Sequence, residues 1–308
     1  DVQRGVVMEE FKQRCLNQPY GDVGHLLRPL AYKVHPYQWP TIGKELSHIA
    51  NATLDEVKDF FFRFYAPNNA VLAVTGNISF EETVALTEKW FASIPKRDVP
   101  VRQLPQEPAQ TEERRLVVER NVPIDSLFMA YHMCERAHPD YYAFDILSDI
   151  LSNGKSSRLN RHLVQEKQLF SSIDAYISGT VDAGLFHISG KPAAGVSLEE
   201  AETAVREELN RLQNEAVTVQ ELEKVKNKFE STQIFGNINY LNVATNLAWF
   251  ELNGAAEDME KEVERYRSVT AGQLQAVAQT SFDKRNGVVL YYKGLSPAVS
   301  VREGVKLD

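Results

Sequence analysis

The chain has 308 residues, 43% of them hydrophobic and 25% charged, with a formal net charge of -8. This size and composition are typical of a globular protein with two domains, and they exclude a disordered or fibrous chain. The acidic balance argues against a nucleic-acid partner, because binding to phosphates requires a basic surface. There is no run of about 18 apolar residues, so no membrane span is predicted, and a cytoplasmic or periplasmic location stays open.

The first stretch with a recognisable pattern runs from Gln3 to Glu10. A helix over these residues places Gln3, Val7 and Glu10 on one face, because seven residues make about two turns. A carboxylate on such a face can ligate a metal ion, and a polar group two turns earlier can support it by hydrogen bonding. The same pattern is also typical of a solvated helix face. The residues alone therefore leave both interpretations open.

Residues 1–95 are assigned to the C-terminal remnant of a first α+β domain. The predicted elements are a short helix near 23–32, a helix from Thr53 to Phe64, a strand at 70–74 and a helix at about 80–91. Thr53 and Glu56 form a capping box at the start of the second of these helices. The aromatic residues from Phe60 to Tyr65 have helical spacing and are predicted to be mostly core.

Residues 96–112 are rich in proline and are predicted to be an extended linker between domains. A second domain at 113–296 follows, and a short tail at 297–308 ends the chain. The predicted strands of the second domain lie at 115–120, 126–134, 172–178, 184–189 and 288–292, and its helices begin near 140, 158, 197, 218 and 270. Ser197 and Thr218 both read as capping boxes. This order predicts an α+β domain, with an antiparallel sheet and helices on one face.

An internal repeat links the two parts of the chain. A capping Thr, a helix, a breaker ending in Asn and a strand occur in the same order after Thr53 and after Thr270, with 16 residues from Thr to Asn in both (69 - 53 and 286 - 270). The repeat predicts two related domains. Between the first strand of the second domain, at Arg115, and Thr270 lie 155 residues (270 - 115), but only 52 precede Thr53. The first domain is therefore expected to be truncated, with roughly 100 residues missing before Asp1, which is itself not a Met.

Three stretches together resemble the M16 family of zinc peptidases, the group of pitrilysin, insulysin and the mitochondrial processing peptidase. They are Gln3 to Glu10, the run from Pro67 to Gly76, and Gly154 to Leu159. The resemblance implies paired α+β domains that close around a peptide. It also implies a zinc ion held by an inverted H-x-x-E-H motif and a distant Glu.

The resemblance makes Glu10 the third zinc ligand. Gln3 stands where the family has a Glu that supports this ligand, and an amide can still form a hydrogen bond there. None of the seven histidines lies in an H-x-x-E-H motif, so the two histidine ligands and the general base are absent from this chain. Zinc is therefore expected as the cofactor of a full-length parent, and residues 1–308 are predicted to be inactive.

Many family members also hold the substrate backbone with an Arg and a Tyr seven residues apart. The matching positions here are Val164 and Ser171, which cannot polarise a carbonyl group in the same way. A second M16-like subunit, in a homodimer or heterodimer, is the hypothesised source of this pair.

Three functions compete. The first is the C-terminal portion of an M16-type zinc metalloendopeptidase subunit that cleaves peptides or unfolded segments, and the retained Glu10 favours it. The second is a non-catalytic M16-like subunit for assembly or peptide binding, which the missing Arg/Tyr pair favours. The third is an unrelated two-domain binding protein, which requires the repeat to be accidental.

Overall fold

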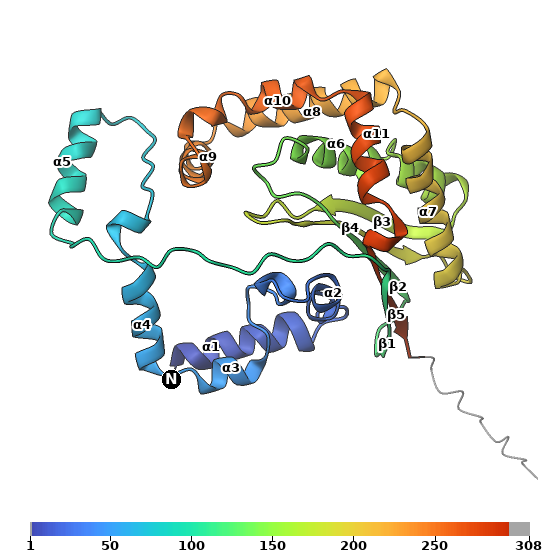
Figure 1. Ribbon diagram of the computed structural model, residues 1–308, viewed down its shortest axis with the longest axis horizontal. Helices are drawn as coiled ribbons and strands as arrows, with labels where there is room; N and C mark the ends of the chain where they lie inside the picture. The colour runs from blue at the N-terminus through green and yellow to red at the C-terminus, as the bar shows by residue number, and fades with distance from the viewer. Residues whose placement is uncertain (1, 296–308) are drawn as a thin grey trace, which may run out of the picture.

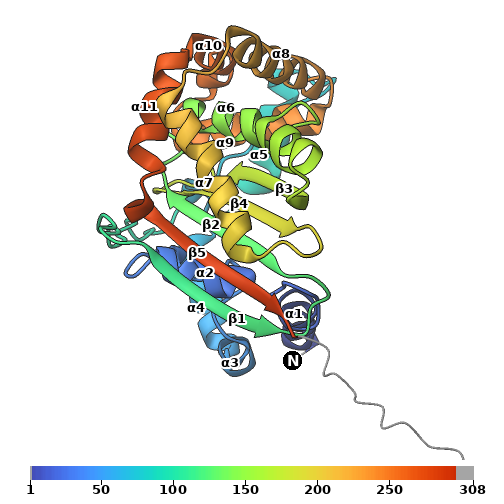
Figure 2. The same cartoon turned by 90° about the vertical axis from the view of Figure 1, so that its right-hand side faces the viewer.

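A computed structural model describes residues 2–295, and its centre is a five-stranded sheet with the strand order β1-β5-β2-β4-β3 (Figures 1 and 2). The strands are β1 (Arg114–Arg120), β2 (Ser126–His132), β3 (Phe170–Ile177), β4 (Leu185–Pro192) and β5 (Gly287–Gly294). All five overlap the predicted strands. The sheet is not purely antiparallel, however, because β5 lies between β1 and β2 and runs parallel to β1. A strand placed between two antiparallel strands must be parallel to one of them.

One face of the sheet is covered by helices of the second part of the chain. These helices are α6 (Tyr141–Ser152), α7 (Leu198–Asn214), α8 (Val219–Gly236), α10 (Glu262–Ser268) and α11 (Ala271–Ser281), with α9 (Tyr240–Asn253) beside them and a π-helical turn at Asn160–Glu166. Leu127, Leu147 and Phe186 are fully buried between sheet and helices. Thr218 forms the predicted capping box with Glu221, whereas Ser197 accepts only the backbone N–H of Glu200.

The opposite face of the sheet is covered by α2 (Val23–Ala31), which comes from the first part of the chain. Leu27, Ala31 and the following Tyr32 form a second core with residues of β2, β4 and β5. The Tyr32 hydroxyl donates a hydrogen bond to the backbone oxygen of Ala183, 3.0 Å away. The helices of the second domain itself therefore lie on one face, as predicted, whereas the cover of the other face by a helix of the first half was not predicted. A sheet that is apolar on both faces needs a cover on each side, and here the first half of the chain supplies one of them.

The other helices of the first half lie away from the sheet (Figure 1). They are α1 (Val2–Phe11), α3 (Leu46–Asn51), α4 (Leu54–Phe64) and α5 (Phe80–Phe91). The strand predicted at 70–74 is wrong for this structure, since these residues are in neither helix nor strand. The predicted core position of the aromatic run is also wrong, because Phe60 and Phe62 are 56% and 57% exposed. Both errors have one cause: a strand and an apolar helix face each need a neighbouring layer, and residues 2–295 provide none here.

The repeat is visible in the positions of the helices. Elements of the two halves begin 217 residues apart: α2 and α9 at 23 and 240, α4 and α11 at 54 and 271, and two 3₁₀ turns at 67 and 284. Thr53 and Thr270 both form complete capping boxes, with Glu56 and Gln273. The predicted cap, helix and breaker thus recur in the predicted order, while the strand after them is formed only in the second half.

Candidate functional site

The helix α1 packs against the rest of the chain through one face and leaves its acidic end accessible. Phe11 is buried, and its ring lies 5.3 Å from the ring of His25. Arg4 donates a hydrogen bond to the backbone oxygen of Ala52, at the end of α3. These contacts fix the orientation of α1 about its axis, because residues 4 and 11 lie on one side of the helix.

Glu10 lies beside this packed face and is accessible. Its side chain is 45% exposed and forms an ion pair with Arg14, at 2.9 Å. Gln3 and Val7 are exposed, and the helix α1 includes all three residues that the spacing predicted to share one face. An exposed ion pair between neighbouring helical turns contributes little to stability, so Arg14 is a weak competitor for another partner of this carboxylate.

The described residues do not by themselves fit a zinc ion. Within residues 2–295, no group of three or more His, Cys, Asp or Glu side chains could hold a metal. One carboxylate is an insufficient ligand set, since zinc sites use at least three protein ligands. The roles of Glu10 as a ligand and of Gln3 as its support therefore stay predictions.

Val164 and Ser171 occupy two different kinds of position. Val164 lies in the π-helical turn Asn160–Glu166 and packs against the main core. Ser171 lies on β3, at a bulge, and its hydroxyl donates to the backbone oxygen of Lys191 at 3.1 Å. Neither side chain carries a charge toward a ligand. Their assignment as the substituted Arg/Tyr positions stays a prediction.

The proline-rich stretch between the two parts is anchored, although residues 95–113 contain neither helix nor strand. The Glu107 carboxylate accepts hydrogen bonds from three successive backbone N–H groups, those of Lys33, Val34 and His35, at 2.7, 2.9 and 2.9 Å. Burial opposes ionisation of Glu107, but the three donors outweigh it and hold the pKa of this carboxyl below its ordinary value. The end of α2 is thereby tied to the linker.

A second anchor lies five residues earlier. Arg102 forms a two-pronged ion pair with Asp182, in the loop between β3 and β4. The hydrogen bond from Arg102 holds the pKa of the Asp182 carboxyl below its ordinary value. A local sequence pattern contains no sign of either anchor, because the partners are 72 to 80 residues apart in the chain.

Replacing Glu107 with Ala is expected to release this anchor. Amide hydrogen exchange of Lys33, Val34 and His35 should become faster at neutral pH, because their acceptor is lost. The same amides should lose protection in the unmodified chain as the pH falls below 4.5, the ordinary pKa of this carboxyl, since the contribution of a carboxylate with a depressed pKa is complete above its unfolded pKa and is lost as the group is protonated. Glu112→Ala, in the same linker, is the control and should leave these amides unchanged. Unchanged exchange in Glu107→Ala would contradict the anchor.

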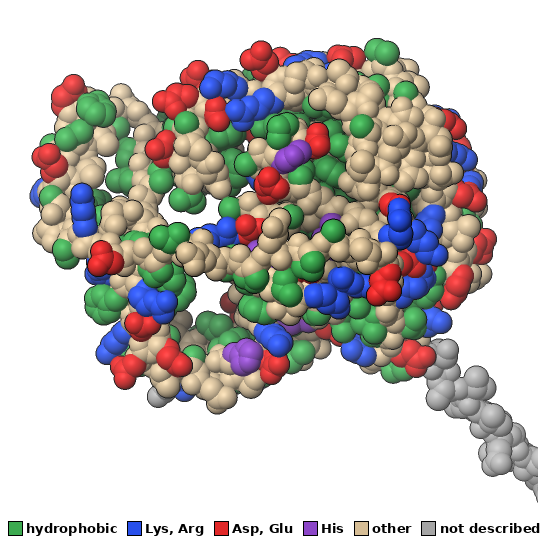
Figure 3. Space-filling view, viewed as in Figure 1, with side chains coloured by type: hydrophobic (Ala, Val, Ile, Leu, Met, Phe, Trp, Pro, Cys, Tyr) green, Lys and Arg blue, Asp and Glu red, His purple; other side chains and the backbone are tan. Residues whose placement is uncertain are grey.

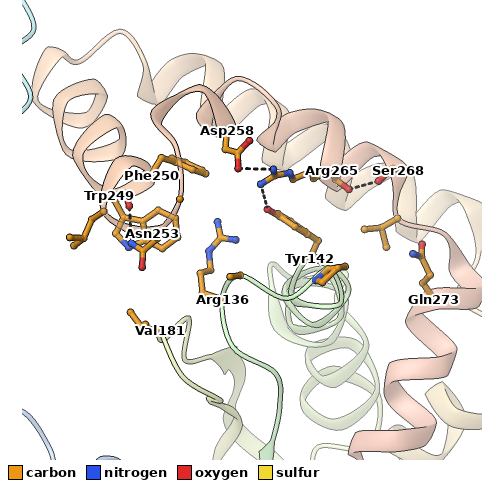
Figure 4. A pocket seen from close by; sticks show the side chains of 15 residues that line it. Arg136, Tyr142, Val181, Trp249, Phe250, Asn253, Asp258, Arg265, Ser268 and Gln273 are labelled. Atoms are coloured by element: carbon orange, nitrogen blue, oxygen red, sulfur yellow. Dashed lines mark hydrogen bonds and ion pairs between the residues drawn. The ribbon is translucent and has the colours of Figure 1, made fainter. Parts of the chain in front are cut away.

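A cleft with a volume of about 610 Å³ lies between α6, α9 and α10 (Figure 4). The guanidinium of Arg136 points into it, 4.1 Å from the ring centre of Tyr141 and 4.9 Å from that of Trp249. Arg136 also donates to Glu262. Across the cleft, Arg265 donates to the Tyr142 hydroxyl, and it pairs with Asp258.

These contacts connect α6, α9 and α10 and stabilise their packing around the cleft. The two arginines are matched by Glu262 and Asp258, so their charges are balanced within the protein. The guanidinium of Arg136 is also attracted to the rings of Tyr141 and Trp249, and this attraction is stronger where water is excluded. Burial raises the pKa of Tyr141 to about 12, so this ring keeps its hydroxyl proton at neutral pH. The sequence did not indicate this group, because no short motif joins residues 136 and 265.

Comparison with known proteins identifies the family. The family described as "Peptidase M16 inactive domain" matches residues 51–229, which is more than half of the chain. The chain belongs to the peptidase M16 family. This M16 chain is also similar to the zinc protease PqqE of Helicobacter pylori, with 31% identity over 227 residues, covering 73% of the chain and 51% of the relative. It is 26% identical over 230 residues to the uncharacterized zinc protease YmxG of Bacillus subtilis, covering 75% of the chain and 54% of that protein. The M16 chain thus spans about half the length of these curated relatives.

Solved structures share the fold. A protease from Helicobacter pylori matches with a TM-score of 0.86 and 26% identity, covering 95% of this M16 chain and 71% of that structure. A peptidase M16 inactive domain from Pseudomonas fluorescens matches with a TM-score of 0.84 and 19% identity, covering 96% and 70%. The family and the α+β fold expected from the sequence are therefore confirmed. Among residues 2–295, none of the helices has the length and apolar character needed to cross a membrane.

Proposed function

We propose that this M16 chain is the C-terminal portion of a zinc-dependent metalloendopeptidase subunit that cleaves peptides or unfolded segments. Residues 1–308 alone do not cleave in this proposal, because they lack the histidine ligands and the general base. The relatives named zinc proteases support a peptidase origin for the whole protein. When bound, the zinc ion would activate a water molecule for attack on the peptide bond.

The accessible carboxylate of Glu10 is the observation that carries the proposal. It is presented on the side of α1 that does not pack on α3, with an exposed ion pair as its only described hydrogen-bonding or charged contact. A carboxylate held this way can complete a zinc site whose other ligands come from another segment. Gln3, two turns earlier, can orient it by hydrogen bonding.

The second candidate is a non-catalytic M16-like subunit for assembly or peptide binding. Val164 and Ser171 favour it, since neither can replace an Arg or a Tyr at the substrate backbone. The two proposals are compatible if a second M16-like subunit in a dimer supplies the Arg/Tyr pair to the zinc-bearing subunit. Rapid cleavage of peptides by a full-length subunit purified alone would contradict such sharing.

The test begins with the reading frame upstream of the codon for Asp1. An H-x-x-E-H motif about 75 residues before Glu10 supports the peptidase, as expected for inverzincins of this family. The full gene product should then contain zinc, measured by mass spectrometry of the purified protein, and cleave an unfolded fluorogenic substrate, with or without a partner subunit. A related domain with the histidines replaced excludes catalysis and favours the binding subunit.

A further inference from the structure

The helix α2 covers only part of its face of the sheet. It packs against β1, β2 and β5, whereas β4 contributes only Leu185 to the core beneath it and β3 contributes no described residue. On β3, Ile173 and Ala175 are buried in the main core on the other face. The alternating residues Asp174 and Tyr176 therefore point to the side of α2, and both are exposed. We call this uncovered part of β3 and β4 the open face.

Two rings and a hydroxyl group form a polar cluster on the open face. Tyr176 on β3 and His187 on β4 are cross-strand neighbours, and their rings are stacked with centres 4.8 Å apart. The Ser178 hydroxyl lies 2.9 Å from Nε2 of His187, so it can donate to this nitrogen and leave the imidazole proton on Nδ1. The hydroxyl of Tyr176 has no hydrogen-bond partner among the described residues. The cluster therefore has donors that can serve a ligand.

Arg28 on α2 adds a positive charge to this cluster. Its side chain is half-buried, and its one hydrogen bond to a described residue goes to the backbone oxygen of Tyr37, at 3.3 Å. It forms no ion pair with any described carboxylate. The Tyr37 hydroxyl accepts the backbone N–H of Asp182, which places this end of α2 beside the loop that joins β3 to β4. Most N–H donors of the guanidinium are therefore unused.

The effect of this charge is seen in the two rings. Burial lowers the pKa of His187, and the charge of Arg28 lowers it further, to about 4, so the imidazole is neutral at neutral pH. Burial raises the pKa of Tyr176, and the charge of Arg28 opposes this rise. Both directions are expected for groups close to an unneutralised guanidinium.

The surroundings of the cluster also favour an anion. Figure 3 shows Lys and Arg side chains gathered around α2 and the strands beside it, although the chain has a net charge of -8. One of them is Lys191 on β4, which is exposed and lies 5.1 Å from the ring centre of Tyr20. Asp174 is the acidic neighbour that opposes this field, and its charge acts on Tyr176. A local excess of positive charge attracts anionic groups.

We propose that Arg28, Tyr176 and His187 form a binding site for a carboxylate group of a peptide. A guanidinium binds a carboxylate through paired, charge-assisted N–H···O hydrogen bonds. The Tyr176 hydroxyl and the Nδ1–H of His187 supply further donors. The inference rests on the proposed function, to which it adds a substrate class: peptides that present a carboxylate at the C-terminus or on an Asp or Glu side chain.

The experiment measures the binding of four fluorescent peptides to residues 1–308 by anisotropy at pH 7. All share one unfolded sequence: one pair has a free or an amidated C-terminus, and the other is amidated and has a single Glu or Gln in its interior. The carboxylate member of a pair should bind about tenfold more tightly than the neutral one. A preference within the first pair identifies a C-terminal site, and one within the second pair a side-chain site. Equal affinities of all four peptides overturn the proposal.

Substitutions then locate the site. Arg28→Met should abolish the preference for the carboxylate, because it removes the charge and the donors but keeps an apolar side chain of similar length. Arg63→Met is the control, since Arg63 is an exposed arginine on α4 that pairs with Asp59. A preference that survives Arg28→Met overturns the assigned site.

Two further substitutions test the site without disturbing the core. Tyr176→Phe should weaken carboxylate binding several-fold; Tyr176 is 52% exposed, so the loss of its hydroxyl leaves the packing intact. Asp174→Asn should strengthen the binding, because it removes a neighbouring negative charge. Unchanged affinities in both variants contradict the site. These measurements need neither zinc nor cleavage, so a full gene product without zinc would refute the proposed function and leave the binding result unaffected.

Discussion

Replacing Glu10 with Gln in the full gene product is expected to abolish tight zinc binding and peptide cleavage together. An amide oxygen carries no charge to offset the metal ion, and zinc sites with two histidines require an anionic or third imidazole ligand. The loss of affinity should exceed the ~10- to 100-fold that substitutions around metal ligands cause. The measurement is the zinc content of the protein after dialysis against a weak chelator, followed by a cleavage assay.

Glu9→Gln is the matched control for this change. Glu9 is the preceding residue, is 60% exposed and pairs with Lys12 on the adjacent turn. It lies about 100° around the helix from Glu10, so it cannot reach the same site. Zinc content and activity should stay close to those of the unmodified protein. If both variants lose zinc equally, the effect is one of helix charge, and Glu10 is not a ligand.

The helices were predictable because their signals are local. Three helices begin with a complete capping box, at Thr53, Thr218 and Thr270. In each box the Thr side chain accepts the backbone N–H of the residue three positions later, and the side chain of that residue accepts the backbone N–H of the Thr. The strand at 184–189 could also be recognised, because from Phe186 onward its buried residues alternate with less buried ones. The family could be inferred from the order of three short stretches, none of which identifies it alone.

The strand predicted at 70–74 depended on information that a local pattern does not contain. Its β-branched residues have the same character as those of β5, which pairs with β1 and β2. A strand forms only where neighbouring backbone accepts its hydrogen bonds, and residues 70–74 have no such neighbours within residues 2–295. The exposed aromatic residues of α4 have the same explanation.

Contacts between distant residues were not predictable at all. Arg136 meets Trp249 and Glu262, and Glu107 binds the end of α2, through pairs that lie at least 72 residues apart. Their geometry depends on the completed packing of helices and sheet. For the same reason the position of α2 was missed: its apolar stripe predicts a buried helix but does not indicate which sheet it covers.

Replacing Glu202 with Ala is expected to destabilise the second half of the chain by about 2–3 kcal/mol. Glu202 lies on α7, and its side chain is only 9% exposed. It accepts hydrogen bonds from Arg115 on β1 at 2.5 and 3.0 Å, from Arg206 at 2.7 Å and from the Tyr291 hydroxyl on β5 at 2.5 Å. Removal of this carboxylate leaves these donors without their shared acceptor. The expected loss of stability is smaller than for a fully buried ion pair, because Arg115 is partly exposed to water.

The pH dependence of this effect follows from the pKa of Glu202. Burial opposes ionisation, but the hydrogen bonds from Arg115, Tyr291 and Arg206 outweigh it and lower the pKa to about 2. A depressed carboxyl pKa stabilises the folded state above the unfolded value, here about 4.5, and this contribution is lost as the pH falls toward 2. Urea unfolding should therefore show a large difference between the unmodified chain and Glu202→Ala at pH 7, and a smaller one below about pH 4. Glu207→Ala, on the same helix and 52% exposed, should change stability by less than about 1 kcal/mol at either pH. If the difference in unfolding free energy between the unmodified chain and Glu202→Ala is the same at both pH values, Glu202 is not ionised in the folded protein, because only a charged carboxylate makes its contribution pH-dependent.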